Sequence, residues 1–241
     1  MAVDFRRDGV RYSLVWDVLS EVVSARVAAT GRPALDIVDV GGGTGGLAVP
    51  FAALGHNVTV VDPSPDALAA AQRRAAEADA RLTSVQGEAA SLDSVVGPGA
   101  ADLVICHNVL EYVEEPADAM SAIARVLRPS ATVSVIASNA VAAVLHRALA
   151  GRFAEARRLL ADKAACTPRR FTLPELIELV ERAGLRAGEA HGLRIFGGLV
   201  PGALLEGDVA ATEALRALEE AAASTPPLRD IAAQLHVLGH R

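Results

Sequence analysis

Apolar and polar positions change along the chain in two alternating patterns. Short runs rich in β-branched residues predict strands, and several are apolar almost throughout, as in strands covered on both faces. The segments between them place apolar residues at helical spacing. The expected strands of the first half cover residues 35–40, 57–62, 81–87, 101–108 and 132–138. This alternation predicts an α/β fold with a doubly wound, mostly parallel sheet.

The expected helices of this half lie at residues 47–54, 64–78 and 115–127. In the second of them, Ser64 stands where an N-cap is expected. Pro65 follows in the first helical turn, where a residue without an N–H group is tolerated.

The pattern changes after residue 138. A long helical segment rich in Ala and Arg comes first, and a helix with Thr172 as its expected N-cap and Gly184 as its expected stop follows. The remaining expected elements are a strand at 186–196, an Ala-rich helix at 207–223 and a final strand at 232–241. The sequence therefore predicts a seven-stranded sheet with helical insertions after strands 5 and 6.

The domain organisation follows from these elements. We expect residues 1–34 to form an N-terminal helical lead-in and residues 35–241 to form one large domain. The insertions, at about 140–171 and 200–226, are expected to form a cap beside the C-terminal half of the sheet.

Composition narrows the class of protein. Hydrophobic residues make up 51% of the 241 residues and aromatic residues only 3%, so the core must consist mainly of Ala, Val and Leu. No apolar run reaches the ~18 residues of a membrane span, and the N-terminus lacks the apolar core of a signal peptide. Two cysteines give no disulfide framework, and a net charge of −6 disfavours indiscriminate nucleic-acid binding. We expect a cytoplasmic protein with no membrane segment and no metal site.

A glycine-rich loop follows the first expected strand in the stretch "IVDVGGGTGG". Its glycines are Gly41, Gly42, Gly43, Gly45 and Gly46. Bare backbone N–H groups at the start of the next helix suit a nucleotide or a carboxylate. Asp62 ends the second strand, where an acid can accept hydrogen bonds from both ribose hydroxyls. The loop and the acid together favour an adenosine-type cofactor over a merely structural tight turn.

The spacing of the loop fits two cofactor patterns. Gly41-x-Gly43-x-x-Gly46 satisfies the dinucleotide fingerprint. Asp39-x-Gly41-x-Gly43-x-Gly45 resembles motif I of the class I S-adenosylmethionine-dependent methyltransferases. "VLRPSATVSVIAS" is similar to this family's L-(R/K)-P-G-G turn, with Ser130 and Ala131 in place of the glycines. An NAD-type oxidoreductase and a non-catalytic cofactor-binding module stay open as alternatives.

Other stretches carry a narrower resemblance. "CHNVLEYV", "GLRIF", Arg11 and the terminal "LRDIAAQLHVLGHR" resemble the bacterial tRNA 5-carboxymethoxyuridine methyltransferases, from about Arg11 to the C-terminus. The resemblance implies a Rossmann-like methyltransferase domain at 35–241, with S-adenosylmethionine (SAM) as cofactor and S-adenosylhomocysteine (SAH) as product. It also implies that the carboxylate of a modified wobble uridine in tRNA is the methyl acceptor. A small-molecule O- or N-methyltransferase is the alternative.

The resemblance also implies the residues that hold the cofactor. Arg11 would pair with the methionine carboxylate, Asp62 would hold the ribose, and Glu88 and the Ala89 amide would contact adenine. His107 matches a position in the cofactor pocket. The full expected set is Arg11, Asp39, Gly41, Gly42, Gly43, Gly45, Asp62, Pro63, Glu88, Ala89 and His107. The alternative interpretations are purely structural: Arg11 as an exposed arginine, Glu88 as an acid at the start of a helix, and His107 as a buried structural histidine.

Three further residues are expected on the acceptor side. Arg194 would hold the acceptor carboxylate or a flanking phosphate. Asn139 would contact the pocket rim or cap a helix, and Tyr112 would stack on a base or line the core. A carboxylate acceptor is ionised at neutral pH and needs no general base. The sequence offers no evident carboxylate–histidine dyad, in keeping with such an acceptor.

Residues 141–171 carry seven basic side chains against two acidic ones. The basic residues are Arg147, Arg152, Arg157, Arg158, Lys163, Arg169 and Arg170, and the acidic ones are Glu155 and Asp162. This segment predicts contacts to the phosphates of tRNA near the anticodon. A solvated helix face is the other interpretation. The sequence leaves the oligomeric state open.

Overall fold

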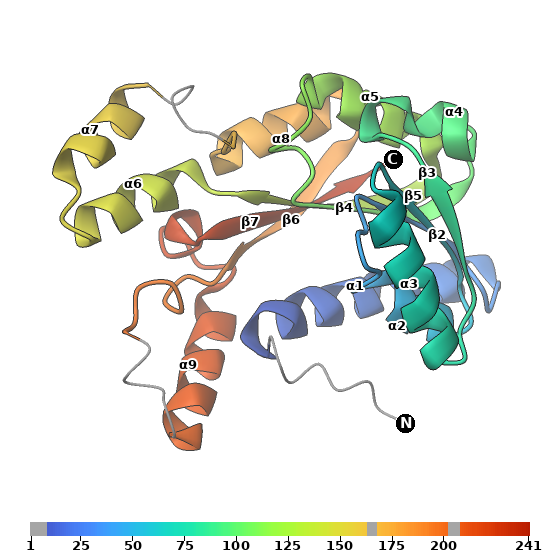
Figure 1. Cartoon of the computed structure of the whole chain (residues 1–241), viewed down its shortest axis with the longest axis horizontal. Coiled ribbons are helices and arrows are strands. Elements are labelled where there is room, and N and C mark those ends of the chain that lie inside the picture. The colour runs from blue at the N-terminus through green and yellow to red at the C-terminus, as the bar shows by residue number, and fades with distance from the viewer. Residues whose placement is uncertain (1–8, 163–167, 202–207) are drawn as a thin grey trace.

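Seven strands form a single sheet in the order β3-β2-β1-β4-β5-β7-β6 (Figure 1). The structure is a computed structural model that describes residues 9–162, 168–201 and 208–241, with side chains described from residue 14 onward. The strands are β1 (Asp36–Val40), β2 (Asn57–Asp62), β3 (Leu82–Gln86), β4 (Ala101–His107), β5 (Leu127–Ser138), β6 (Arg186–Leu193) and β7 (Gln234–His240). Strands β1 to β5 pair in parallel, and β7 runs antiparallel to both β5 and β6. The predicted mostly parallel, seven-stranded sheet is confirmed.

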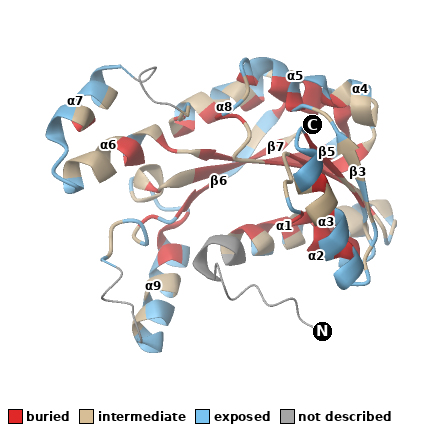
Figure 2. Ribbon diagram, viewed as in Figure 1, coloured by how far each residue is buried: buried red, intermediate tan, exposed pale blue. Residues whose placement is uncertain are grey.

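Helices cover both faces of the sheet and create two apolar cores (Figures 1 and 2). On one face lie α1 (Gly9–Thr30), α2 (Ala48–Ala53) and α3 (Pro65–Glu77), where Leu19 and Phe51 are fully buried. On the other face lie α4 (Leu92–Val96), α5 (Pro116–Val126) and α8 (Leu173–Arg182). The central strands are buried from both sides, which explains why their sequences are almost continuously apolar.

The helix caps and the helix stop that the sequence predicts are present in the structure. Ser64 accepts a hydrogen bond from the Ala67 N–H at 3.3 Å and so caps α3. Thr172 and Glu175 form a capping box at the start of α8. Gly184, with a φ of +79°, follows α8 in the left-handed conformation expected of a helix stop.

The insertions after strands 5 and 6 are helical, with one difference in detail. The long segment after β5 forms two helices, α6 (Ala140–Leu149) and α7 (Phe153–Ala161), rather than one. They separate at Gly151, whose φ of +72° ends the first helix. The insertion after β6 contains α9 (Val209–Ala222). Figure 1 shows α6, α7 and α9 projecting beyond the sheet rather than covering its faces.

A buried carboxylate ties the long first helix to the sheet. Asp102, whose side chain is fully buried, accepts hydrogen bonds from Arg26 at 3.1 Å, from Arg128 at 2.8 Å and from Arg32. The backbone N–H of Asp36 donates a further bond at 3.1 Å. Three arginines and a strand end thus meet on one acid, where β1, β4 and β5 begin.

No helix in the described part of the chain is both long enough and apolar enough to cross a membrane.

Candidate active site

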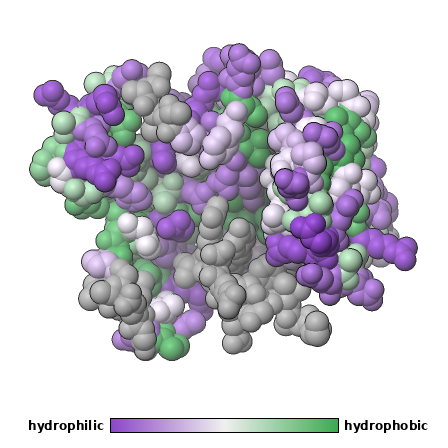
Figure 3. Space-filling model, in the orientation of Figure 1, coloured by the Kyte–Doolittle hydropathy of each residue, from purple (hydrophilic) through white to green (hydrophobic). Residues whose placement is uncertain are grey.

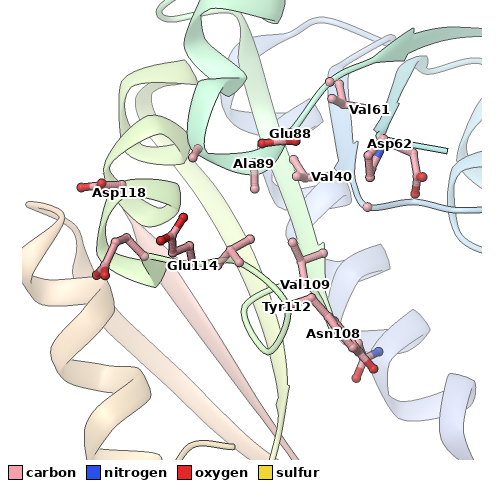
Figure 4. Close-up of a pocket in the computed structure, with 16 residues that line it drawn as sticks. Val40, Val61, Asp62, Glu88, Ala89, Asn108, Val109, Tyr112, Glu114 and Asp118 are labelled. Atoms are coloured by element: carbon pink, nitrogen blue, oxygen red, sulfur yellow. The ribbon is translucent and has the colours of Figure 1, made fainter. Parts of the chain in front are cut away.

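The carboxyl ends of β1, β2, β3 and β4 surround a cavity of about 570 Å³ (Figure 4). This larger cavity is lined by apolar Val40, Val61 and Val109 and by polar Asp62 and Glu88. Figure 4 shows Asp62 and Glu114 approaching it from opposite sides. Its position outside the strand ends is where open α/β sheets bind their ligands. Its volume is that of a site for a small ligand.

The glycine loop reaches this cavity through Gly41, which lines it with bare backbone. A Cβ on Gly41 would lie 2.4 Å from Val109 Cγ2, and one on Gly42 would lie 2.6 Å from Asp39 Cγ. Gly41, Gly43 and Gly45 all have positive φ values, between +53° and +77°. Side chains at these positions would therefore clash or be strained, which explains the glycine-rich sequence.

Asp62 links this loop to the tip of β2. Its Oδ2 accepts the Gly43 N–H at 3.0 Å, and its Oδ1 accepts the Ser64 N–H at 2.9 Å. Each carboxylate oxygen can accept a second hydrogen bond, so the acid can still receive two hydroxyl donors. Asp62 is 8% exposed and lines the larger cavity. This geometry suits a ribose diol.

A smaller cavity of about 210 Å³ adjoins the larger one. The two share Gly41 and Asn108, and the smaller cavity is lined further by Asp39, His107 and Leu193. Burial raises the pKa of Asp39 to about 7, and the charge of Asp62 adds to this rise. An acid held at the edge of ionisation is suited to receive a cationic ligand.

The two adjoining cavities fit an adenosyl group with a charged tail. The larger one offers an acid for a ribose and apolar walls for a base, and the smaller one offers the Asp39 carboxyl. Gly41, the loop residue that lines both cavities, has no side chain that would come between the two parts of a bound molecule.

Most of the predicted cofactor-binding residues line these cavities. Pro63, Glu88 and Ala89 line the larger one with Asp62, and His107 lines the smaller one with Asp39. Glu88 precedes a short 3₁₀ turn, but its side chain accepts no capping hydrogen bond there. Arg11 lies outside the residues whose side chains the structure describes, so its predicted contact is a proposal.

The three predicted acceptor-side residues have different surroundings. Tyr112 lines the larger cavity and is 74% exposed, so the interpretation of Tyr112 as a core residue is wrong. Arg194 is exposed at the end of β6, next to Leu193 of the smaller cavity, with a φ of +58°. Neither is buried by its neighbours.

Of the two alternatives predicted for Asn139, the structure shows the helix cap and not the pocket contact. Asn139 is fully buried and lines neither cavity. Its Nδ2 donates to the carbonyls of Asp230 at 2.9 Å and Ala232 at 2.7 Å, and its Oδ1 accepts the Val141 N–H at 2.9 Å. All of its amide groups are occupied, so we correct its assignment from a pocket contact to a cap of α6.

Sequence reasoning left out one residue that the geometry places centrally. Asn108 lines both cavities, adopts a φ of +57° and accepts a hydrogen bond from Gln234. A left-handed asparagine at a strand end is uncommon and is frequently found at functional sites. Its place directly after His107, at the tip of the fourth strand, was the available signal.

Fold and site together define an α/β protein that binds an adenosine-containing cofactor beyond its first strands. Comparison with known proteins sharpens this class. A family model described as "Methyltransferase domain" matches residues 38–135. A tRNA 5-carboxymethoxyuridine methyltransferase of Escherichia coli (strain K12) is 29% identical over 192 residues, covering 78% of this chain and 72% of the relative.

Two further proteins extend the comparison. A ubiquinone biosynthesis O-methyltransferase of Xanthomonas campestris pv. campestris (strain B100) is 32% identical over 178 residues, covering 72% of this chain and 70% of the relative. The crystal structure of magnesium protoporphyrin IX methyltransferase from Synechocystis PCC 6803 with bound SAH has a TM-score of 0.61 at 19% identity. That match covers 100% of this chain and 89% of the other, and it concerns the fold alone.

The chain belongs to the class I S-adenosylmethionine-dependent methyltransferases. Its cofactor is therefore SAM, and the dinucleotide alternative left open by the glycine spacing falls away. The acceptor is a separate question, because the relatives act on different molecules.

Proposed function

We propose that the protein methylates the carboxylate of 5-carboxymethoxyuridine in tRNA. The observation that carries this proposal is Arg194, an exposed arginine that directly follows Leu193 of the smaller cavity and adopts a left-handed conformation. No ion pair occupies it within the part of the chain that the structure describes. A guanidinium binds a carboxylate through two parallel hydrogen bonds. The similarity to a tRNA 5-carboxymethoxyuridine methyltransferase supports the same acceptor.

For this reaction the protein mainly has to align the acceptor with the methyl group of the cofactor. When bound, SAM supplies a methyl group that its sulfonium has already activated. An acceptor carboxylate is ionised at neutral pH, so no residue has to remove a proton from it. In this proposal Asp62 fixes the cofactor, Arg194 orients the acceptor, and both reduce the entropy cost of bringing the reactants together.

Helices α6 and α7 are the proposed tRNA-binding surface. Arg152, Arg157 and Arg158 are exposed there, while Arg147 pairs with Glu155 at 3.1 Å. Figure 3 shows strongly hydrophilic residues over these helices beside hydrophobic ones. Contacts of such cations with phosphates release counterions and give affinity that falls with salt. Lys163 lies outside the described residues. A tRNA acceptor would imply work in the cytoplasm.

The proposed acceptor can be tested on tRNA directly. In a strain that lacks the gene, digested bulk tRNA analysed by mass spectrometry should contain free 5-carboxymethoxyuridine in place of its methyl ester. Purified protein with SAM should then restore the ester on this tRNA. Unchanged methyl ester in the deletion strain would overturn the tRNA proposal and favour a small-molecule acceptor, a class that includes the substrate implied by the name of the Xanthomonas relative.

Two variants separate the proposed roles. Asp62→Ala should weaken SAH binding by about 1–3 kcal/mol, because a buried acceptor of two hydrogen bonds is lost. Arg194→Ala should lower turnover on tRNA and leave SAH affinity unchanged. Arg186→Ala, an exposed arginine at the opposite end of β6, is the matched control. Equal turnover of the Arg194 and Arg186 variants would remove Arg194 from the site.

A further inference from the structure

Asn108 lies where the two cavities of the site meet. Like Gly41, it lines both of them (Figure 4). In a bound adenosyl group with a charged tail, the sulfur joins the two parts, so the methyl group would be transferred close to this junction. The backbone N–H of Asn108 donates to the Ile136 carbonyl at 2.8 Å, which anchors the residue to β5. Its amide is therefore held where cofactor and acceptor would meet.

Gln234, the first residue of β7, binds one end of this amide. Its Nε2 donates a hydrogen bond to Asn108 Oδ1. Because β7 runs antiparallel to β5 and β6, it begins at the sheet edge where those strands end. The preceding residue, Ala233, donates its N–H to the Arg194 carbonyl at 3.2 Å. The start of β7 thus contacts both Asn108 and the arginine of the proposed acceptor site.

Burial decides which end of the Asn108 amide is presented to a ligand. Gln234 Oε1 is buried and has no hydrogen-bond partner within the described residues. If both amides were flipped, Asn108 Nδ2 would donate to Gln234 Oε1, and the buried group without a partner would be the Gln234 amino group. A buried donor without an acceptor is rarer in proteins than a carbonyl oxygen without a donor. The arrangement in which Asn108 Oδ1 accepts is therefore favoured.

This arrangement leaves the Asn108 Nδ2 atom available as a donor. No residue in the described part of the chain accepts a hydrogen bond from it, and the atom is not buried. Such a donor suits an anionic acceptor, because an ionised carboxylate only accepts hydrogen bonds, on two oxygens. One oxygen can accept from Nδ2 while the other attacks the methyl carbon. A hydroxyl acceptor would instead have to lose a proton, which an amide N–H cannot take up.

We propose that Asn108 is a specificity-determining residue whose Nδ2 donates a hydrogen bond to the non-reacting oxygen of the acceptor carboxylate. Gln234 is the positioning residue that makes the amide present its N–H rather than its carbonyl. The inference rests on the proposed function and deepens it, because it adds a donor from the tip of β4 to Arg194 from the end of β6. Donors on two strands would fix the plane of the carboxylate as well as its charge.

Two substitutions of Asn108 test the donor, with tRNA containing 5-carboxymethoxyuridine as acceptor and SAM as cofactor. Asn108→Gly removes the amide and tolerates the left-handed backbone. We expect kcat/KM to fall about 10-fold, the scale of one hydrogen bond to a charged group. Asn108→Asp keeps an oxygen that accepts from Gln234 but turns a negative charge toward the acceptor, so kcat/KM should fall about 100-fold. The SAH affinity of Asn108→Gly, measured by calorimetry, should stay within about twofold of wild type.

The order of the two losses separates a donor role from a structural one. Asn108→Asp keeps the hydrogen bond with Gln234 and Asn108→Gly loses it, so a merely structural amide would make Asn108→Gly the more damaging substitution. Asn57→Asp is the matched control. It makes the same change in an exposed asparagine at the start of β2, at the opposite edge of the sheet. Turnover and SAH affinity of this control should equal those of wild type.

Gln234→Glu tests the positioning role. A carboxylate cannot donate to Asn108 Oδ1, so the Asn108 amide should flip, donate to the new carboxylate and present its carbonyl to the acceptor. We expect kcat/KM on tRNA to fall about 10-fold. In the Asn108→Gly background the same substitution should cause no further loss, whereas an unrelated structural effect of Gln234 would add to that of Asn108→Gly. A melting curve identifies any variant that fails to fold, and the Asn108 variants test the donor independently of Gln234→Glu.

The outcomes separate this inference from the proposed function. Full activity of Asn108→Gly on the tRNA, or a larger loss in it than in Asn108→Asp, would overturn the inference and leave the tRNA acceptor in place. Weaker SAH binding by Asn108→Gly with an unchanged KM for tRNA would assign the amide to the cofactor and would also overturn it. No methylation of this tRNA by the wild-type protein would remove the proposed function and, with it, the carboxylate contact of Asn108.

Discussion

The buried carboxyl of Asp39 lies within electrostatic range of Asp62. Burial contributes most to raising the pKa of Asp39 to about 7, the charge of Asp62 raises it further, and the backbone N–H of Ala48 opposes the rise. The two acids, on the neighbouring strands β1 and β2, thus have different roles. Asp62 holds hydrogen-bond donors, while Asp39 is half protonated near neutral pH.

This relationship predicts a pH-dependent affinity for SAM. A cation bound in the smaller cavity favours ionised Asp39, so binding should release a proton below pH 7. The affinity should rise up to ~10-fold per pH unit between about pH 5.5 and 7 and become constant above about pH 8. Calorimetry in two buffers with different ionisation enthalpies measures the released proton. Asp39→Asn should remove both effects, and an affinity of the wild type that is constant over this range would contradict the assignment.

Asp102 supports a prediction about stability. Although its burial alone would raise the pKa of its carboxyl, hydrogen bonds from the Asp36 N–H, Arg32 and Arg26 hold that pKa below the ordinary value of 3.8. The stabilisation is complete above this ordinary value and is lost as the pH falls through the lower folded value. Asp102→Asn should therefore lower the free energy of unfolding by about 2–4 kcal/mol at pH 7.

Urea unfolding of Asp102→Asn and of the wild type at pH 7 checks this value. Asp93→Asn is the control, since the half-buried Asp93 forms a surface ion pair with the exposed Arg125 at 2.7 Å and contributes little. The difference between Asp102→Asn and wild type should shrink as the pH falls below 3.8, and a difference that grows there would contradict the role of the ionised carboxylate.

Ser130 departs from the family pattern, and its backbone conformation allows the effect on stability to be predicted. It replaces a glycine of the similar turn and adopts a φ of +60°, a conformation that strains a side chain. Ser130→Gly should therefore stabilise the protein by about 0.5–1 kcal/mol, after the entropy cost of glycine in the unfolded chain is subtracted. Thermal unfolding measures the gain. Ser121→Gly within α5 should destabilise instead, and a loss of stability in Ser130→Gly would show that the turn is not strained.

Local patterns predicted most of the fold and the cofactor half of the site. Strand runs, the Ser64 cap and the glycine loop are encoded within a few residues, and Asp62 follows the loop at a characteristic distance. The network on Asp102 was not predictable, because its arginines lie 76, 70 and 26 residues away in the sequence. The hydrogen bond between Ser134 and His236 was not predictable either, because it depends on strand order, in which β7 lies beside β5. Asn139 failed as a site residue because the backbone of the segment before β7 uses its amide.

Glu219 supports the last prediction, which concerns the acceptor side. This nearly buried acid of α9 accepts three backbone hydrogen bonds, from Ile195 at 2.7 Å, Phe196 at 2.9 Å and Gly197 at 2.7 Å. The segment that it holds directly follows Arg194. Glu219→Gln would place an amide donor against backbone donors and should cost about 1–3 kcal/mol of stability. Loosening the segment should raise the KM for the acceptor while SAH affinity, measured by calorimetry, stays unchanged. Glu220→Gln, one position along and on the exposed side with Arg216, is the control. If both variants keep a normal KM, α9 does not position Arg194, and the arginine must be held by its own strand alone.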